Sequence, residues 1–352
     1  MNQPVNEILI GDALTRLKEL PDESVNCCVT SPPYWGLRDY GVAGQIGLES
    51  TPYEYVEIMV GIFDEVRRVL RDDGTLWLNL GDSYATGAGS ARSPGGKCFG
   101  KQNEAVDAGS FPRSQPNRMP IAGLKPKDLI GIPWRVAFAL QAAGWWLRSD
   151  IIWAKPNCMP ESVQDRPTRS HEYIFLLSKS ERYYYDAAAI REPFQTDPRE
   201  NYPARAKITG RENQEAAAAR GNDRGKTGGF PPRADKQRGH SRRHAGFNDR
   251  WDKMEREEQV ANGRNKRDVW TISPQPFPEA HFATFPEALI VPCIMAGCPA
   301  GGVVLDPFMG AGTTALVSVK AGRQFIGIEL NPAYAKIAME RIQPEISQPR
   351  LA

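Results

Sequence analysis

The sequence contains no long apolar run and no leader-like beginning. Among its 352 residues, no apolar stretch approaches the roughly 18–20 residues that a membrane-spanning helix needs. The segment Met1–Glu7 does not combine a basic stretch with an apolar one, as a signal peptide does. These absences predict that the protein has no membrane partner and is cytoplasmic.

Clustered metal ligands and cysteine pairs are also scarce. The six cysteines form no Cys-x-x-Cys pair, and the chain has only four histidines. Zinc sites and disulfide frameworks depend on such clusters, so neither is predicted. His240 and His244 have the spacing of metal ligands, but they lie in an Arg-rich polar run without a cysteine or an acid pair nearby. We therefore predict no metal site.

A strong net charge is lacking as well, since the formal value is only +2. The distribution of charge is more informative. Residues 190–268 contain 19 Lys and Arg against 13 Asp and Glu, and residues 86–127 contain 7 against 2. Basic segments beside a slightly acidic remainder are typical of an enzyme that binds a polyanion, although solvated loops would give the same pattern.

The stretch Ser31-Pro32-Pro33-Tyr34 follows Val25–Val29, a short apolar run that predicts a buried strand. Two prolines remove two backbone donors and fix two φ angles, so the chain must turn sharply there. At the carboxyl end of a strand, where open α/β sheets bind ligands, the turn would present a hydroxyl, free carbonyl groups and an aromatic ring. This set suits a flat ring that bears an amino group. An ordinary proline-rich turn with a packed tyrosine is the alternative.

Near the C-terminus the sequence predicts a βαβ nucleoside-binding unit. Val303–Asp306 is expected to be a buried strand, and residues 307–314 a glycine loop that opens the helix Ala315–Ala321. Gln324–Glu329 is expected to be a second strand, ending in an acid. No Gly-Lys-Ser/Thr follows the glycines, which excludes a P-loop. A dinucleotide-binding fold stays open on this unit alone.

The loop Asp306-Pro307-Phe308-Met309-Gly310-Ala311-Gly312-Thr313-Thr314 resembles the S-adenosylmethionine loop of amino-group DNA methyltransferases. Ser-Pro-Pro-Tyr resembles the catalytic motif of the same family. The resemblance implies an α/β, Rossmann-like methyltransferase fold with a mostly parallel seven-stranded sheet and an antiparallel hairpin. Because the Pro-Pro turn precedes the glycine loop in the chain, the resemblance is to the circularly permuted β class.

The same resemblance implies three parts of the chain. Residues 1–189 would be the catalytic half, with a mobile basic loop at 86–127, residues 190–268 a target-recognition insertion, and residues 269–352 the cofactor-binding half. Hydrophobic patterning predicts the other elements of the two halves. The expected strands are Glu7–Ile10, Thr75–Leu80, Trp145–Trp153 and His171–Ser178, and the expected helices are Ala13–Leu20, Pro52–Leu70, Ile130–Ala143, Glu287–Ala296 and Ala333–Ile342.

The resemblance also implies which residues act. The catalytic residues would be Ser31, Pro32, Pro33 and Tyr34. The cofactor would be S-adenosylmethionine, bound by Asp12, Phe282, Thr284, Asp306, Phe308, Gly310, Gly312, Thr313, Thr314, Glu329 and Asn331. Asp12 also has the position of a helix N-cap, and Thr313 and Thr314 are equally suited to N-capping.

In this family, serine before Pro-Pro-Tyr is usual for methylation of cytosine N4, and Asp or Asn for adenine N6. The resemblance therefore favours cytosine, with adenine as the alternative. The amine is inaccessible in a duplex, so the base must be flipped, and Tyr34 is the expected stacking face. Methylation at carbon 5 would need a nucleophilic cysteine on the catalytic loop, whereas Pro292-Cys293 lies in an apolar helix. Carbon-5 chemistry is therefore excluded.

Double-stranded DNA is the expected partner, read by the two basic segments. A homodimer and a cognate restriction enzyme stay open as further partners. Two other classes also stay open: a methyltransferase for RNA or a small molecule, and a catalytically silent nucleic-acid binder. The long basic insertion disfavours the first, and the intact Ser31–Tyr34, Asp306 and Glu329 disfavour the second.

Overall fold

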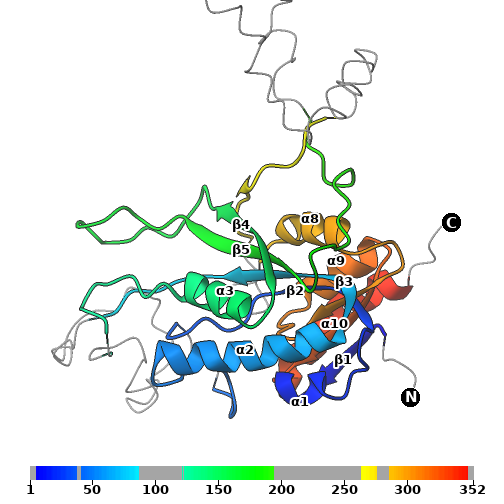
Figure 1. Ribbon diagram of the computed structural model, residues 1–352, viewed down its shortest axis with the longest axis horizontal. Helices are drawn as coiled ribbons and strands as arrows, with labels where there is room; N and C mark the ends of the chain where they lie inside the picture. Colours follow the sequence, from blue (N-terminus) through cyan, green and yellow to red (C-terminus); the bar gives the residue numbers. More distant parts are fainter. Residues whose placement is uncertain are drawn as a thin grey trace, which may run out of the picture. The chain divides into compact units, whose positions relative to one another are not determined.

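The computed structural model describes residues 5–37, 41–86, 121, 123–193, 263–275 and 285–347. The chain forms two compact units, residues 1–190 with 267–352, and residues 191–266. All the named strands and helices below belong to the first unit (Figure 1). Phe282 and Thr284, and most of the segments 86–127 and 190–268, lie outside the described residues.

The first unit is built on one mixed sheet of eight strands in the order β1-β8-β7-β2-β3-β5-β4-β6. Strand β5 is antiparallel to both of its neighbours, and every other pairing is parallel. The strands are β1 (Glu7–Ile10), β2 (Val25–Thr30), β3 (Leu70–Leu80), β4 (Trp146–Ala154), β5 (His171–Ser178), β6 (Val269–Thr271), β7 (Val303–Asp306) and β8 (Gln324–Glu329). The α/β fold and the antiparallel hairpin are confirmed. The strand number is one higher than predicted, because the three-residue β6 is too short to show a periodicity.

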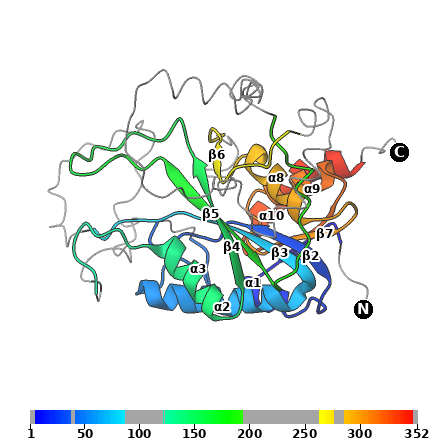
Figure 2. The same cartoon turned by 45° about the horizontal axis from the view of Figure 1, so that its top comes forward.

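Helices cover both faces of the sheet (Figure 2). They are α1 (Ala13–Leu17), α2 (Pro52–Val69), α3 (Ile132–Ala142), α8 (Glu287–Gly297), α9 (Thr313–Lys320) and α10 (Pro332–Ser347). Alternate strand residues face opposite layers. In β5, Phe175 and Leu177 pack in the core formed with α1, α2 and α3, while Ile174 and Leu176 pack in the core formed with α8. A third cluster joins α9 to α10.

Local signals explain most of the element boundaries. The Thr51 side chain accepts a hydrogen bond from the Glu54 amide, and Pro52 occupies the first turn of α2, as is favourable for a helix start. Strand β3 begins at Leu70 rather than at the predicted Thr75, because Leu70 already pairs with Val25 across a register shift. Helix α10 runs beyond the predicted Ile342 to Ser347, through a last turn too polar to show the apolar period.

The parallel strands bring several chain segments to one edge of the sheet. Strands β2, β7 and β8 end there at Thr30, Asp306 and Glu329. Since β5 runs the opposite way, it begins at the same edge, where Tyr173 pairs with Leu80 at the end of β3. The first residues of β5 therefore lie beside the last residues of its parallel neighbours.

In the second unit, Glu192 and Arg264 form an antiparallel bridge. The Glu192 carboxylate also pairs with Arg264 and Lys266, at 3.4 and 3.3 Å. Residues separated by 72 positions are thus held together by backbone and side-chain bonds.

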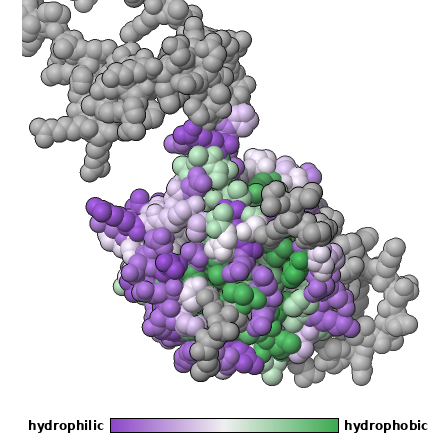
Figure 3. All heavy atoms as spheres, turned by 90° about the vertical axis from the view of Figure 1, so that its right-hand side faces the viewer, coloured by the Kyte–Doolittle hydropathy of each residue, from purple (hydrophilic) through white to green (hydrophobic). Residues whose placement is uncertain are grey.

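Figure 3 shows one face of the molecule, on which hydrophobic side chains (green) are interspersed with hydrophilic ones (purple). Within the described ranges, no helix has both the length and the apolar character needed to cross a membrane.

Candidate functional site

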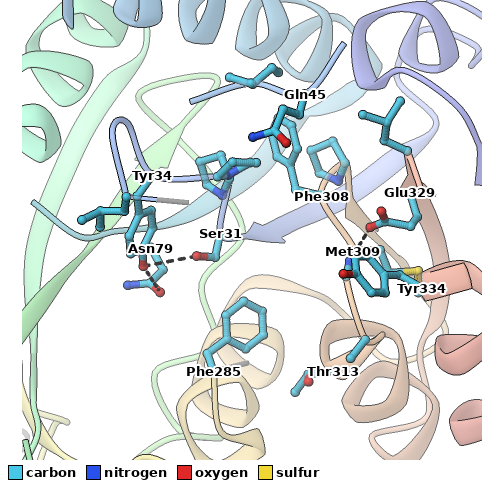
Figure 4. A pocket seen from close by; sticks show the side chains of 18 of the residues that line it. Ser31, Tyr34, Gln45, Asn79, Phe285, Phe308, Met309, Thr313, Glu329 and Tyr334 are labelled. Carbon is cyan, nitrogen blue, oxygen red and sulfur yellow. Dashed lines mark hydrogen bonds between the residues drawn. The ribbon is translucent and has the colours of Figure 1, made fainter. Parts of the chain in front are cut away.

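A cavity of about 730 Å³ opens at the carboxyl edge of the sheet. Its walls come from the turns after β1, β2, β7 and β8, from the last residues of β4 and from the first residues of β5. In Figure 4, Ser31, Tyr34 and Asn79 lie at one end, and Glu329, Met309 and Tyr334 lie at the other. Volumes of roughly 300–1,000 Å³ are usual for small-molecule and cofactor sites.

The Pro-Pro turn is held rigidly by the residues around it. The Tyr55 hydroxyl donates to the Pro33 carbonyl at 2.9 Å, and the Gly36 amide donates to the Gly47 carbonyl at 2.8 Å. Trp35 is buried, and its indole N–H donates to the Glu49 carbonyl at 3.0 Å. The turn therefore presents Ser31 and Tyr34 to the cavity in a fixed frame.

Tyr34 is part of a polar network that the sequence did not reveal. Its hydroxyl oxygen lies 2.7 Å from Glu172 Oε2 and 3.1 Å from Asn79 Oδ1, and the Ser31 hydroxyl donates to it at 3.3 Å. Burial and the charge of Glu172 raise the pKa of Tyr34 well above its usual range. The phenol is therefore neutral at physiological pH. Its ring lies against Gly81, where an added Cβ would come within 2.5 Å of Cε2.

Glu172 is held from several sides. Asn79 Nδ2 donates to its Oε2 at 3.2 Å, and the Lys155 ammonium forms a close ion pair with its Oε1. The same ammonium lies 4.1 Å from the centroid of the Trp153 ring. One signal for this cluster existed in the sequence, because an antiparallel His171–Ser178 strand must begin at the ligand-binding edge. Strand order, which the pattern does not give, was needed to bring Glu172 to Tyr34.

The glycine loop and Glu329 form the other end of the cavity. Glu329 accepts hydrogen bonds from the Gly310 and Asn331 amides, each at 2.8 Å, and burial raises the pKa of its carboxyl group. Gly312 has φ of +78°, and a Cβ there would meet Ala338 Cβ at 2.8 Å. A side chain at this position would be strained by backbone conformation and by contact.

Asp306 is buried behind the cavity rather than in its wall. Its Oδ1 accepts from the Thr30 hydroxyl at 2.6 Å and from the Phe308 amide at 3.1 Å. Burial raises the pKa of Asp306 to about 6, against the opposing effect of these donors. Asp306 thus ties the end of β2 to the turn after β7.

Three predicted binding residues have structural partners of their own. Asp12 caps α1 by accepting from the Thr15 amide at 2.9 Å, and Asn331 Oδ1 accepts from the Ala333 amide at 2.9 Å. The Thr313 hydroxyl accepts from Arg341 at 2.9 Å. The N-cap of α9 is Gly312, so the alternative of N-capping by Thr313 or Thr314 is wrong. Glycine at positive φ already turns the chain into the helix.

The predicted site residues divide into three sets. The cavity is lined by Asp12, Ser31, Pro32, Pro33, Tyr34, Phe308, Gly310, Thr313, Glu329 and Asn331. Asp306, Gly312 and Thr314 are buried or packed behind the lining, and the Thr314 hydroxyl donates to the Val29 carbonyl at 3.3 Å. Phe282 and Thr284 lie outside the described residues, but their neighbour Phe285 lines the cavity.

Cys293 lies inside α8, fully buried, and its thiol donates to the Leu289 carbonyl at 3.4 Å. It is not among the lining residues, so it has no access to the cavity. Within the part of the chain that the structure describes, no cluster of three or more His, Cys, Asp or Glu side chains is arranged to hold a metal ion.

Comparison with known sequences gives matches along nearly the whole chain. The DNA methylase family model N6_N4_Mtase matches residues 25–340. Type II methyltransferase M.Cfr9I of Citrobacter freundii is 46% identical over 335 residues, which cover 95% of this chain and 87% of the relative. Type II methyltransferase M.SmaI of Serratia marcescens is 45% identical over 336 residues, covering 96% and 90%.

Solved structures are similar over a comparable length. TTHA0409 of Thermus thermophilus, a putative DNA modification methylase complexed with S-adenosyl-L-methionine, has a TM-score of 0.51 and 23% identity, covering 97% of this chain and 96% of its own. The cytosine-N4-specific PvuII DNA methyltransferase has a TM-score of 0.55 and 17% identity, covering 97% and 87%. At these identities the likeness shows a shared fold, which agrees with the fold predicted from the sequence.

Proposed function

The chain belongs to the N6/N4 DNA methylase family, and on that premise we propose that it methylates N4 of a flipped cytosine in double-stranded DNA. The observation that carries the proposal is a serine hydroxyl fixed at the cavity end of the Pro-Pro turn. DNA methylation follows from the family, whereas the choice of cytosine rests on Ser31. The assignment to the circularly permuted β class, in which the Pro-Pro turn precedes the glycine loop, is also part of this proposal.

We assign S-adenosylmethionine as the methyl donor, as in the complex of TTHA0409. The fit is supported by a buried carboxylate, Glu329, beside the glycine loop at the end of the cavity opposite Ser31. A carboxylate at the end of the second strand of a βαβ unit is suited to ribose hydroxyls, and Asp12 and Asn331 line the same cavity. When bound, the group supplies an electrophilic methyl on a sulfonium.

The amine of cytosine is a weak nucleophile, because its lone pair is delocalised into the ring. Catalysis therefore requires acceptors that favour a tetrahedral nitrogen with its lone pair directed at the methyl carbon. The Ser31 hydroxyl and the Pro32 carbonyl are the acceptors we assign, since the Pro33 carbonyl is already bonded to Tyr55. Rigid acceptors stabilise the transition state more than the planar ground state, so the rate rises through positioning.

Tyr34 would stack on the flipped base, as its position in the cavity wall and its neutral phenol suggest. The segment 190–268 is proposed to read the target sequence, because it is basic and rich in Arg, Asn and Gln, which contact guanine and adenine edges.

The test is to incubate the purified protein with duplex DNA and isotope-labelled S-adenosylmethionine, and to identify the product nucleoside by mass spectrometry. N4-methylcytosine is the expected product. N6-methyladenine would keep the family chemistry and overturn the choice of base. Label in RNA but not in DNA would overturn the substrate.

A further inference from the structure

The polar end of the cavity contains a directed chain of hydrogen bonds. The Ser31 hydroxyl donates to the Tyr34 oxygen at 3.3 Å, and the Tyr34 hydroxyl donates to Glu172 Oε2 at 2.7 Å. Each bond points away from Ser31 and toward the carboxylate. Figure 4 shows the first bond of this chain, together with a dashed line from the Tyr34 hydroxyl to Asn79 Oδ1, 3.1 Å away.

At the end of this chain of bonds, the Glu172 carboxylate is held in one orientation by its neighbours. Lys155 pairs with Glu172 Oε1, while Asn79 Nδ2 donates to Oε2 at 3.2 Å and to the Tyr173 carbonyl at 3.0 Å. Glu172 and Lys155 retain 18% and 20% side-chain exposure, so a proton taken up there has an exit to solvent. Both residues line the cavity.

We propose that Glu172 is the terminal proton acceptor of the methyl transfer, reached from the substrate amine through Ser31 and Tyr34. This inference rests on the proposed function, because it requires an amino group beside Ser31. It names a residue that neither the Pro-Pro motif nor the glycine loop contains. The ion pair with Lys155 holds the Glu172 carboxylate in place beside the Tyr34 hydroxyl.

The step balances. The N–C bond to the methyl group forms as the S–C bond of the sulfonium breaks, which moves one positive charge onto the amine nitrogen. That nitrogen loses a proton to the Ser31 oxygen, the Ser31 proton passes to the Tyr34 oxygen, and the Tyr34 proton passes to Glu172. The products are a base with a neutral N-methylated amino group, a neutral thioether and a neutral carboxylic acid at Glu172, with both hydroxyl groups restored.

Tyr34 is suited to pass a proton rather than to hold one. Its pKa is raised well above the usual range by burial and by the Glu172 charge, so a tyrosinate is not formed as a resting state. A hydroxyl that accepts one proton while donating another never becomes charged. The two-bond path is therefore compatible with a buried phenol.

Glu172→Gln is the central variant, because glutamine keeps the shape and one acceptor oxygen but cannot take up the proton. We expect the single-turnover methyl-transfer rate to fall about 10²–10⁴-fold, the range usual for loss of a general base. Tyr34→Phe breaks the same path and should slow the reaction by a similar factor. The double variant should be no slower than the slower single variant, since both changes interrupt one path.

A matched control is Glu65→Gln, which neutralises another partly buried, ion-paired glutamate, bonded to Arg68 at 2.8 Å on α2. Its methylation rate should equal that of the wild type. Calorimetry with S-adenosylmethionine should give the same affinity for all variants, which shows that the cofactor end is intact.

The titration of Tyr34 itself shows whether the Glu172 charge acts on the phenol, as the hydrogen bond between them requires. NMR of tyrosine labelled at Cζ, with Tyr34 assigned by its loss in Tyr34→Phe, should show a lower Tyr34 pKa in Glu172→Gln, because a neighbouring charge is removed.

A wild-type rate in Glu172→Gln would overturn the proposal, as would a Tyr34 titration that is the same in this variant as in the wild type. Failure of the proposed function has a different signature, since the wild-type protein itself would then transfer no methyl group to DNA.

Discussion

The two ends of the cavity are held by different kinds of hydrogen bond. At the Ser31 end, side chains from four separate strands or turns bond to one another, through Tyr34, Asn79, Lys155 and Glu172. At the Glu329 end, the carboxylate is fixed by backbone amides of adjacent loops. Side-chain hydroxyl and carboxyl groups can exchange protons, whereas amides cannot at neutral pH. The contrast supports the proposed assignment, with chemistry at the first end and cofactor binding at the second.

Apart from the Glu172 and Tyr34 variants described above, the largest effect is expected at the reactive end, from Ser31→Ala. Loss of one transition-state acceptor should lower the single-turnover methylation rate by about 10²–10³-fold, as for other preorganised groups of this kind. Cofactor affinity should not change, because Glu329 and the glycine loop are untouched. Rapid-quench methylation and calorimetry would check this pair of results. A weaker cofactor affinity with an unchanged rate would reverse the assignment of the two ends.

Between the ends, Asp306 should make stability depend on pH. Its folded-state pKa of about 6 exceeds the unfolded value of about 3.8, so the folded state binds more protons between these values and loses stability as pH rises through them. The loss is about 3 kcal/mol, at roughly 1.36 kcal/mol for each pKa unit. Urea unfolding of wild type and Asp306→Asn between pH 4 and 7 would measure it. As pH rises, the free energy of unfolding of the wild type should fall relative to that of Asp306→Asn. A difference between the two proteins that is constant with pH would contradict the prediction.

At the binding end, Glu329→Ala should weaken S-adenosylmethionine binding by about 1.5–3 kcal/mol, the usual value of a hydrogen bond to a charged group. The Gly310 and Asn331 amides also lose their acceptor, so a drop in thermal stability should accompany the loss. Calorimetry gives the first quantity and thermal unfolding the second. Glu340→Ala on the exposed surface of α10 is a control for removing a glutamate, and it should change neither.

The smallest effect is expected from Asp12, which has two roles to separate. Asp12→Ala should cost about 1 kcal/mol of stability, since the Thr15 amide loses its cap. Asp12→Ser keeps a capping oxygen and should restore stability. If Asp12 also contacts the cofactor, both variants should weaken cofactor binding in calorimetry. If both variants bind the cofactor with the affinity of the wild type, the role of Asp12 is to cap α1.

The sequence predicted the binding end better than the reactive end, and the reason is physical. Strand β7, the glycine loop, α9 and β8 are contiguous, and buried strands, glycines at positive φ and a terminal acid leave a local pattern. The bond between Tyr34 and Glu172 spans 138 positions and depends on β5 lying beside β3. No periodicity encodes that neighbour relation, although the antiparallel hairpin was predicted.

Burial of polar side chains was the other property that the pattern did not give. Asp306 and Thr314 were expected at the cofactor, as the loop motif suggests, but they are buried behind the lining. The end of the strand at Asp306 was predicted correctly, and the helix starts at Thr313 rather than at the predicted Ala315. The direction of the Asp306 and Thr314 side chains depended on packing against β2.

The bridge between Glu192 and Arg264 has a consequence for how this protein can change over evolutionary time. The bridge holds the two ends of the intervening segment together. The entropic cost of closing such a loop grows only slowly with its length, by about 0.6 kcal/mol for each doubling. Residues between 193 and 263 can therefore be lengthened, shortened or exchanged without altering the sheet that holds the site. On the proposal that residues 190–268 read the target sequence, replacing this one segment would change the target and leave the reaction unchanged.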